Sequence, residues 1–213
     1  MTKVLTITKK DAIKESLLKE RIQLNSTVNK NLFQLPVKLE DRDICEDNED
    51  LLQLIPYISL VDKTSKKIFI YKRGKDNGDR RLTGRCSLGL GGHIEMAPSK
   101  DHDLLDVIIE ETCRELHEEV GLILNDADRS DLRDRLKSGD FGIIYYDGDH
   151  VGKVHLGISL VIELDSETIN SKEATIITEV SWRTIESLET EKLLKEDIIL
   201  EPWSRILLDT VLC

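Results

Sequence analysis

The sequence lacks most of the features that mark secreted, membrane and zinc-binding proteins. Its four cysteines include no C-x-x-C pair, and its amino terminus contains no apolar run of the length that a signal peptide or a membrane span requires. Its five histidines include no pair at the H-x3-H spacing typical of zinc ligands, so the sequence alone predicts no zinc site. We therefore expect a reduced, cytoplasmic protein with no membrane partner.

Positive charge is also scarce. The chain has 30 lysines and arginines against 41 aspartates and glutamates, which gives a formal net charge of -11. A surface that follows a nucleic-acid backbone needs an excess of positive charge, so we expect no nucleic-acid polymer as a partner. With 213 residues, of which 39% are hydrophobic, the chain is long enough to bury a sizeable core.

Hydrophobic periodicity predicts both helices and strands. Apolar spacing predicts an amphipathic helix over residues 9–22, and the seven acids of residues 40–50 predict a solvated loop or linker. A long helix is expected from about residue 99 or 101 to residue 120, and another apolar pattern closes the chain over residues 196–212. Strands are predicted over residues 51–61 and 67–73, joined by a polar turn, and over residues 141–147, 153–164 and 175–182. This mixed order predicts an α+β fold, with helices packed on a mixed β-sheet.

The long predicted helix carries four carboxylates on one face. With about 100° per residue, Glu111, Glu115, Glu118 and Glu119 share a face about 100° wide. A solvated acidic face is one interpretation, although like charges at this spacing repel each other. The other is a site for Mg²⁺ or Mn²⁺, because these ions prefer clustered oxygen ligands and complete their shell with water and substrate phosphates.

Glycines lie before and after this helix. The double glycine Gly91–Gly92 allows a sharp turn or a close backbone approach, and a carbonyl group there can itself bind a metal. Gly121 suits the end of the helix.

The segment Arg114–Leu122, RELHEEVGL, resembles the second half of the Nudix box, whose full pattern is G-x5-E-x7-R-E-U-x-E-E-x-G-U with U aliphatic. Gly91–Glu95, GGHIE, resembles the start of the box. The resemblance covers residues 51–213 and implies a Nudix-like α/β/α sandwich in which the box helix packs against the mixed sheet. Residues 1–50 are then an amino-terminal extension with helical and acidic-loop segments. The second half of the box matches at every specified position: Arg114, Glu115, Leu116, Glu118, Glu119, Gly121 and Leu122.

The resemblance implies hydrolysis of a nucleoside or other group X linked to a diphosphate, by attack of water on phosphorus, with Mg²⁺ or Mn²⁺ as cofactor. Arg114 is then the cation that orients the carboxylates. The general base is Glu179, in an E-x-x-W pair beyond the box, or else Glu118 or Glu119. The implied metal ligands are the box glutamates and one carbonyl group: Glu115, Glu118, Glu119 and Gly92.

The chain departs from the box in the middle. Between Gly92 and the position eight before Arg114 there are 13 residues rather than 5, and that position is Asp106 rather than a glutamate. If the helix already includes Asp106, this residue points about 180° away from Glu115 and cannot join the cluster, so Glu111 would replace it as a metal ligand. If the helix begins later, the long loop could bring Asp106 back. The sequence leaves both alternatives open.

A local excess of positive charge occurs in residues 72–85, which hold six basic and two acidic residues. This segment is a candidate diphosphate-binding loop, with Arg73 and Arg81 as first choices because a guanidinium group can bind phosphate oxygens bidentately. His93, directly after the glycine pair, is a further candidate for substrate contact. A solvated hairpin loop and an ordinary loop histidine are the alternatives.

Two other functions are compatible with these motifs. A Nudix-like sensor would bind a nucleotide or diphosphate compound without cleaving it. An isomerase of the isopentenyl-diphosphate type would need a cysteine at the glycine pair, whereas here Cys86 lies five residues before Gly91. For each, the expected partner is a small-molecule diphosphate whose X group the sequence does not identify, with a homodimer as one possible assembly.

Overall fold

The computed structural model describes residues 2–19, 21–74, 83–165, 177–188 and 198–210. The chain divides into two compact units. The first unit comprises Met1–Tyr57, Gly91–Arg114 and Ile123–Leu160, and the second comprises Ile58–Leu90, Glu115–Leu122 and Val161–Cys213. The predicted boundary between an extension and a domain at residue 50 stays a prediction.

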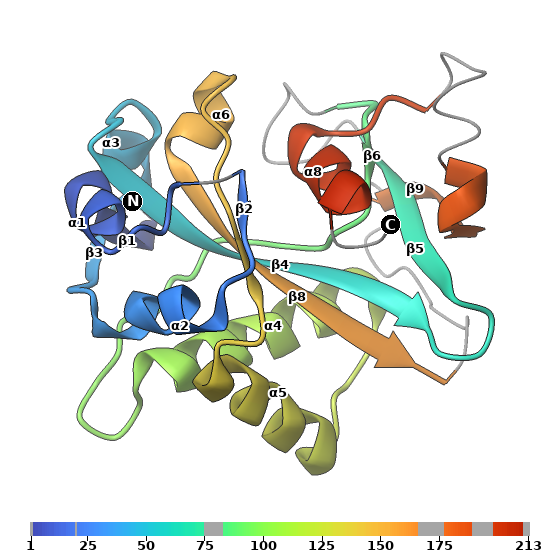
Figure 1. Cartoon of the computed structure of the whole chain (residues 1–213), viewed down its shortest axis with the longest axis horizontal. Helices are drawn as coiled ribbons and strands as arrows, with labels where there is room; N and C mark the ends of the chain where they lie inside the picture. The colour runs from blue at the N-terminus through green and yellow to red at the C-terminus, as the bar shows by residue number, and fades with distance from the viewer. Residues whose placement is uncertain (1, 20, 75–82, 166–176, 189–197, 211–213) are drawn as a thin grey trace. The chain divides into compact units, whose positions relative to one another are not determined.

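The first unit is built on a mixed set of strands. Strand β1 (Lys3–Thr8) lies antiparallel to both β3 (Lys38–Asp41) and the beginning of β4 (Leu51–Asp62). Strand β7 (Gly142–Ile144) lies antiparallel to β2 (Ile22–Gln23) and to β8 (His155–Leu164). Strands β4 and β8 are neighbours and run in the same direction (Figure 1).

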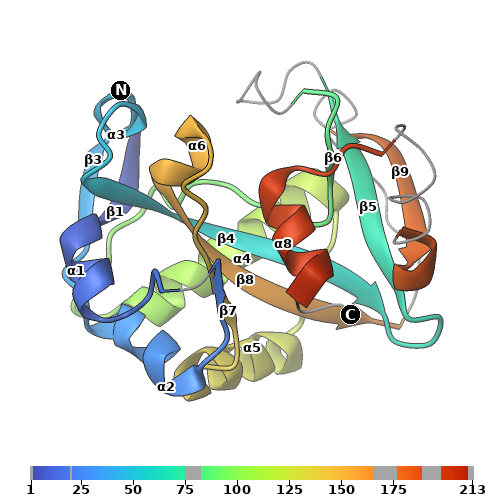
Figure 2. The ribbon, with the colours of Figure 1, turned by 45° about the horizontal axis from the view of Figure 1, so that its top comes forward.

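The helices of the first unit are short except for two. The long helix α4 (Leu104–Val120) begins in this unit, and α5 (Asp126–Ser138) lies beside it (Figures 1 and 2). A capping box between Asn125 and Asp128 starts α5, and Gly139, in the left-handed conformation with φ +82°, ends it. The shorter elements are α1 (Lys9–Lys14), α2 (Ser26–Asn29), the 3-10 helix η1 (Lys30–Gln34), α3 (Arg42–Glu46) and α6 (His150–Lys153).

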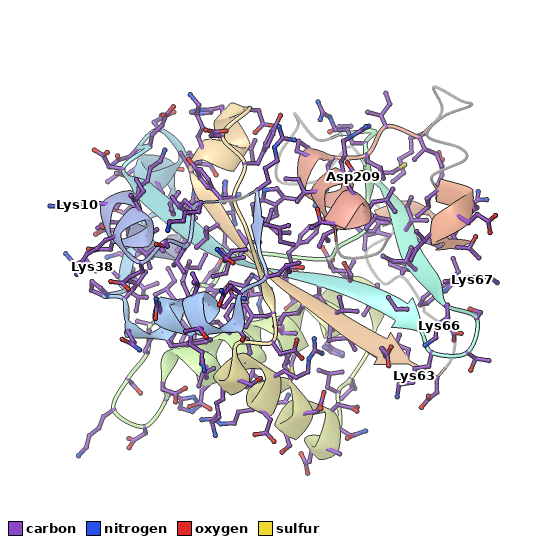
Figure 3. The ribbon with its side chains drawn as sticks, in the orientation of Figure 1. Lys10, Lys38, Lys63, Lys66, Lys67 and Asp209 are labelled. Carbon is purple, nitrogen blue, oxygen red and sulfur yellow. The ribbon has the colours of Figure 1, made fainter. Side chains whose placement is uncertain are left out.

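In the second unit, β5 (Lys67–Arg73) is antiparallel to the end of β4, to β6 (Cys86–Ser87) and to β9 (Ile177–Thr184). The β4–β5 turn forms because the Asp62 carboxylate accepts hydrogen bonds from the Thr64 and Ser65 amides. Figure 3 shows three lysines grouped at this hairpin: Lys63, Lys66 and Lys67.

Helix α8 (Pro202–Thr210) completes the second unit, and Pro202 suits its first position because proline has no amide hydrogen to pair. Its Leu208 joins residues of β5 and of the following segments in one apolar cluster. Each such side chain contributes on the order of 1.5–3 kcal/mol when it is fully buried. The buried members are Ile68, Ile70, Leu88, Leu188, Leu200 and Leu208.

Two predictions of local structure are wrong. The helix predicted over residues 9–22 ends at Lys14, since Ser16 takes a left-handed φ of 65° and Ile22 begins β2. The acidic residues 40–50 are not a loop throughout, because they include the end of β3 and all of α3, whose Cys45 is fully buried. At Ile22 and at residues 40–41, strand pairing with β7 and with β1 outweighs the local sequence pattern.

The predicted hairpin over residues 51–73 is confirmed, and so are the long helix and the α+β class with a mixed sheet. The strand predicted over residues 175–182 is described from Ile177, and its first two residues lie outside the described part. Within the described residues, no helix is both long and apolar enough to cross a membrane.

Candidate functional site

Helix α4 carries the box glutamates and ends where the sequence predicts. Gly121 adopts a left-handed φ of 70°, and the Leu122 amide donates to the Leu116 carbonyl at 3.0 Å. The Gly121 amide donates to the His117 carbonyl at 3.1 Å, which is the bond of an αL cap, in which glycine avoids the strain of a side chain. The cap follows directly after Glu118 and Glu119 and therefore fixes the backbone of the last helical turn, which carries both residues.

Two of the three box glutamates are buried. Glu115 is 6% exposed and Glu119 is 8% exposed, whereas Glu118 is exposed. A solvated acidic face does not predict this, because burying a carboxylate is unfavourable unless a cation, a metal or hydrogen-bond donors compensate for the lost water. The burial therefore favours a binding role for this face.

Arg114 lies against Glu111, which is 7% exposed. Its Nε donates to Glu111 Oε2 at 3.2 Å, and its second guanidinium nitrogen pairs with Oε1. The predicted orienting cation thus holds a carboxylate one helical turn before Glu115. Whether Glu111 also binds a metal stays a prediction.

Asp106 belongs to the beginning of α4, which settles the alternative that the sequence left open. The Asp106 amide donates to Asp103 Oδ1 at 2.9 Å, and the Asp103 amide donates to Asp106 Oδ2 at 3.1 Å. Asp106 also forms an ion pair with Arg133 of α5. Since α4 is helical from Leu104, Asp106 points about 180° away from Glu115.

We expect Asp106→Asn to lower the free energy of unfolding by about 1 kcal/mol at neutral pH, because it weakens the cap and the Arg133 ion pair. The hydrogen bond from Arg133 holds the pKa of Asp106 below its ordinary value. The stabilisation is therefore present above the ordinary pKa of 3.8 and is lost as pH falls through the folded-state pKa.

Urea unfolding at neutral and at acidic pH measures this difference, with Asp101→Asn in the preceding exposed loop as the control. Metal dependence of activity should be unchanged. Loss of metal binding in Asp106→Asn, combined with normal metal binding in Glu111→Gln, would show that Asp106 is the additional ligand and that the choice of Glu111 from the helix face is wrong.

Glu179 lies at an irregularity of β9. The pairing with β5 shifts between Ile70–Ser181 and Lys72–Thr178, and Glu179 takes a left-handed φ of 50°. Its exposed carboxylate pairs with Lys72 Nζ at 3.2 Å. A left-handed glutamate is energetically unfavourable, and such residues are concentrated at functional sites. The predicted role of Glu179 as a base or ligand stays a prediction.

Arg73 takes part in a buried ion pair that the sequence did not predict. Its Nε donates to Glu201 Oε2 at 2.7 Å, and Ser87 Oγ donates to Glu201 Oε1 at 2.6 Å. Only 3% of Glu201 is exposed. No pattern in the sequence distinguishes Glu201 from other acids before a helix. Contact of Arg73 with substrate stays a prediction, and Arg81 lies outside the described residues.

Tyr71 connects this ion pair electrostatically with the box. The side chain is buried, and its hydroxyl donates to the Gly89 carbonyl at 3.0 Å. Burial raises the pKa of Tyr71, and the charges of Glu119 and Glu201 raise it further, while Arg73 opposes them. The second unit thus brings Glu119 and the Arg73–Glu201 pair close to one buried hydroxyl group.

The glycine pair and His93 belong to the first unit. A Cβ at Gly91 would lie 2.4 Å from the Pro56 carbonyl oxygen, so this close approach requires glycine. His93 is half-buried, and burial lowers its pKa to about 3, with Arg42 and His155 contributing. The roles of the Gly92 carbonyl as a ligand and of His93 in substrate contact stay predictions.

Comparison with known proteins identifies one relative by sequence and several by structure. No family model matches the chain. Protein YmaB of Bacillus subtilis (strain 168) is 32% identical over 172 residues, which are 79% of this chain and 75% of YmaB. The crystal structure of Tm1382, a proposed Nudix hydrolase, superposes with a TM-score of 0.72 at 24% identity, over 99% of this chain and 98% of that one. The match with Tm1382 thus includes the amino-terminal region that the sequence motif did not cover. A MutT Nudix hydrolase from Burkholderia pseudomallei matches at a TM-score of 0.49 and 15% identity, over 75% of this chain and 97% of that one.

Proposed function

The chain belongs to the family of YmaB and shares the fold of the proposed Nudix hydrolase Tm1382, and we propose that it is a metal-dependent Nudix hydrolase of a small-molecule diphosphate. In the proposed reaction, water attacks phosphorus and cleaves the diphosphate bond of a compound in which the diphosphate is linked to a nucleoside or other group X. The observation that carries the proposal is the burial of Glu115 and Glu119 on a helix in which the second half of the box, Arg114–Leu122, matches at every specified position.

The donor set of this helix suits Mg²⁺ or Mn²⁺. Carboxylate oxygens are the ligands that these ions prefer, and Glu115, Glu118 and Glu119 lie within two turns of one helix. When bound, such an ion neutralises phosphate charge and lowers the pKa of a water molecule. Glu111 and the Gly92 carbonyl are further proposed ligands.

The proposed roles of Arg114 and Glu179 follow from their contacts. Arg114 donates a hydrogen bond to Glu111 and so restricts the orientation of this carboxylate on the acidic face of the helix. Glu179 is a proposed general base, because its left-handed backbone positions a carboxylate at the exposed surface of the second unit, with Glu118 or Glu119 as the alternative. The diphosphate is proposed to contact three cationic or polar side chains: Arg73, Arg81 and His93.

The isomerase alternative is less favoured by the chemistry of Cys86. Burial raises the pKa of its thiol, so the thiol is protonated at neutral pH and does not resemble an activated thiolate. Cys86 also belongs to β6, where it pairs with Lys72. The sensor alternative differs from the proposed hydrolase only in catalysis and therefore needs a direct test. We place the reaction in the cytoplasm, with a homodimer as one possible assembly.

The test follows one oxygen atom. Purified protein is incubated with a panel of nucleoside, sugar and prenyl diphosphate compounds, with Mg²⁺ or Mn²⁺, in 18O-labelled water. We expect one phosphate-containing product to carry the label, because water attacks phosphorus. Mass spectrometry of the products measures this. An intact, isomerised diphosphate would indicate an isomerase, and stoichiometric binding without release would indicate a sensor.

A further inference from the structure

A second group of metal-ligating side chains lies entirely within the first unit. Glu46 ends α3, His93 follows the glycine pair, and His155 begins β8. One ligand atom from each of these residues lies within 4.8 Å of the other two. Because the three residues are far apart in the sequence, no motif search for closely spaced histidines finds them. Their juxtaposition exists only in the fold.

We propose that Glu46, His93 and His155 form a binding site for a transition-metal ion of the zinc class. Imidazole nitrogen suits zinc and related ions, whereas Mg²⁺ prefers sites made of oxygen ligands. Two histidines and one glutamate are a ligand set that zinc uses, with one position left for water. The site differs in ligand chemistry from the acidic face of α4, and the proposal does not depend on diphosphate hydrolysis.

The distance between the two imidazoles suits a shared ion. Nε2 of His93 lies 3.1 Å from Nε2 of His155, and the two rings are inclined by 62°. With zinc–nitrogen bonds of about 2.0–2.1 Å, two nitrogens at this separation form an angle of about 100° at the ion. This angle lies close to tetrahedral geometry, so only a small movement of the side chains is needed.

Neighbouring groups orient two of the ligands. Nδ1 of His155 lies 2.7 Å from the Val151 carbonyl oxygen. Because a carbonyl oxygen can only accept a hydrogen bond, Nδ1 carries the hydrogen, and the lone pair of Nε2 points towards His93. Arg42 Nε lies 3.7 Å from the Glu46 carboxylate and restricts its orientation. Support of this kind is typical of metal ligands, because it fixes the tautomer of the histidine and the direction of the carboxylate.

Gln53 provides an independent observation. It is fully buried, and within the described part of the chain neither atom of its side-chain amide has a hydrogen-bond partner. The Gln53 backbone amide donates to the Val154 carbonyl at 2.8 Å. In a parallel strand pair this bond places Gln53 beside His155, with both side chains on the same face. A water molecule bound to the ion would give the Gln53 amide the partner that buried polar groups require.

The site would connect three separate segments of the first unit. Figures 1 and 2 show α3 and α6 beside the amino-terminal end of β4. An ion pair of 3.1 Å between Lys153 and Glu49 and a contact of 3.7 Å between His150 Nε2 and Asp47 Oδ1 already join α6 to the α3–β4 connection. An ion that binds only the folded chain adds stability in proportion to its occupancy.

The experiment uses the full-length protein after removal of metal with a chelator. Zn²⁺ is titrated in competition with a chromophoric chelator, and Co²⁺ is titrated by its visible absorption. We expect one equivalent of either ion to bind and the melting temperature to rise with Zn²⁺. Glu46→Gln and His155→Gln should each weaken binding by about 10² or more, since each removes one ligand from the ion. His102→Gln, which changes an exposed histidine of the loop before α4, should bind as the parent does.

Absence of a bound equivalent, or equal affinity in the parent and both ligand variants, would overturn the proposal. Circular dichroism of each variant verifies its fold, and the partly exposed Glu46 gives a variant that should fold normally even if His155→Gln does not. Failure here is distinguishable from failure of the proposed hydrolysis. Glu118→Gln should retain zinc binding, and Glu46→Gln should retain hydrolysis with Mg²⁺.

Discussion

Glu118→Gln and Glu119→Gln are each expected to lower turnover by about 10² or more, with little change in the free energy of unfolding. Glutamine retains the size of the side chain and removes the charge that a divalent ion requires. Glu119 is buried at the end of α4, so its charge acts with little screening by solvent, while Glu118 is exposed and available to substrate. Initial rates against the concentration of Mg²⁺ measure both the maximal turnover and the affinity for the metal.

Glu110→Gln is the matched control. It changes the same residue type on the same helix, but Glu110 points about 140° away from Glu115 and pairs with His102 in the first unit. Near-normal turnover in both Glu118→Gln and Glu119→Gln would refute the metal assignment. A reduced turnover in Glu179→Gln with an unchanged Mg²⁺ requirement would identify Glu179 as the base.

Arg73→Ala is expected to lower the free energy of unfolding by about 3–5 kcal/mol, because it leaves the Glu201 carboxylate buried without its cation. The side chains of Arg73 and Glu201 are only 14% and 4% exposed, so water cannot replace the lost partner. Ser87 would still donate one hydrogen bond. Urea unfolding of the purified variant, followed by circular dichroism, gives the loss directly.

The neighbouring Lys72 provides the control. Its pair with Glu179 is exposed, with side-chain exposures of 37% and 71%, so Lys72→Ala should cost less than about 1 kcal/mol. The double variant Arg73→Met, Glu201→Met should be more stable than Arg73→Ala, because it leaves no buried charge. Unchanged stability in Arg73→Ala would contradict this expectation, whereas a raised KM would support the proposed contact of Arg73 with the diphosphate.

Elements with a strong local pattern could be predicted from the sequence, and elements that depend on distant partners could not. The hairpin of β4 and β5 and the helix α4 carry clear periodicity and turn signals. Strand β1 was not predicted, because its position depends on pairing with β3 and β4 on either side. Helix α5 was also missed, since its few apolar residues give a weak stripe and its capping box at Asn125 is the main signal.

The residues of the candidate site also differ in whether the sequence alone could group them. Arg114 and the box glutamates follow from residues that are adjacent along one helix, so spacing alone groups them. Glu201, Tyr71 and the cluster of Glu46, His93 and His155 join residues that are distant in the sequence, and only the fold brings them together. Asp106 is intermediate, because the sequence posed the question of where α4 begins and the cap with Asp103 answered it.

The left-handed conformation of Glu179 has a consequence for how this position evolves. A residue with a side chain has a steric cost of roughly 1–2 kcal/mol in this conformation, and glycine avoids that cost. Random drift under selection for stability alone would therefore replace the glutamate with glycine or asparagine. We therefore expect relatives that share the proposed reaction to retain a carboxylate at this position.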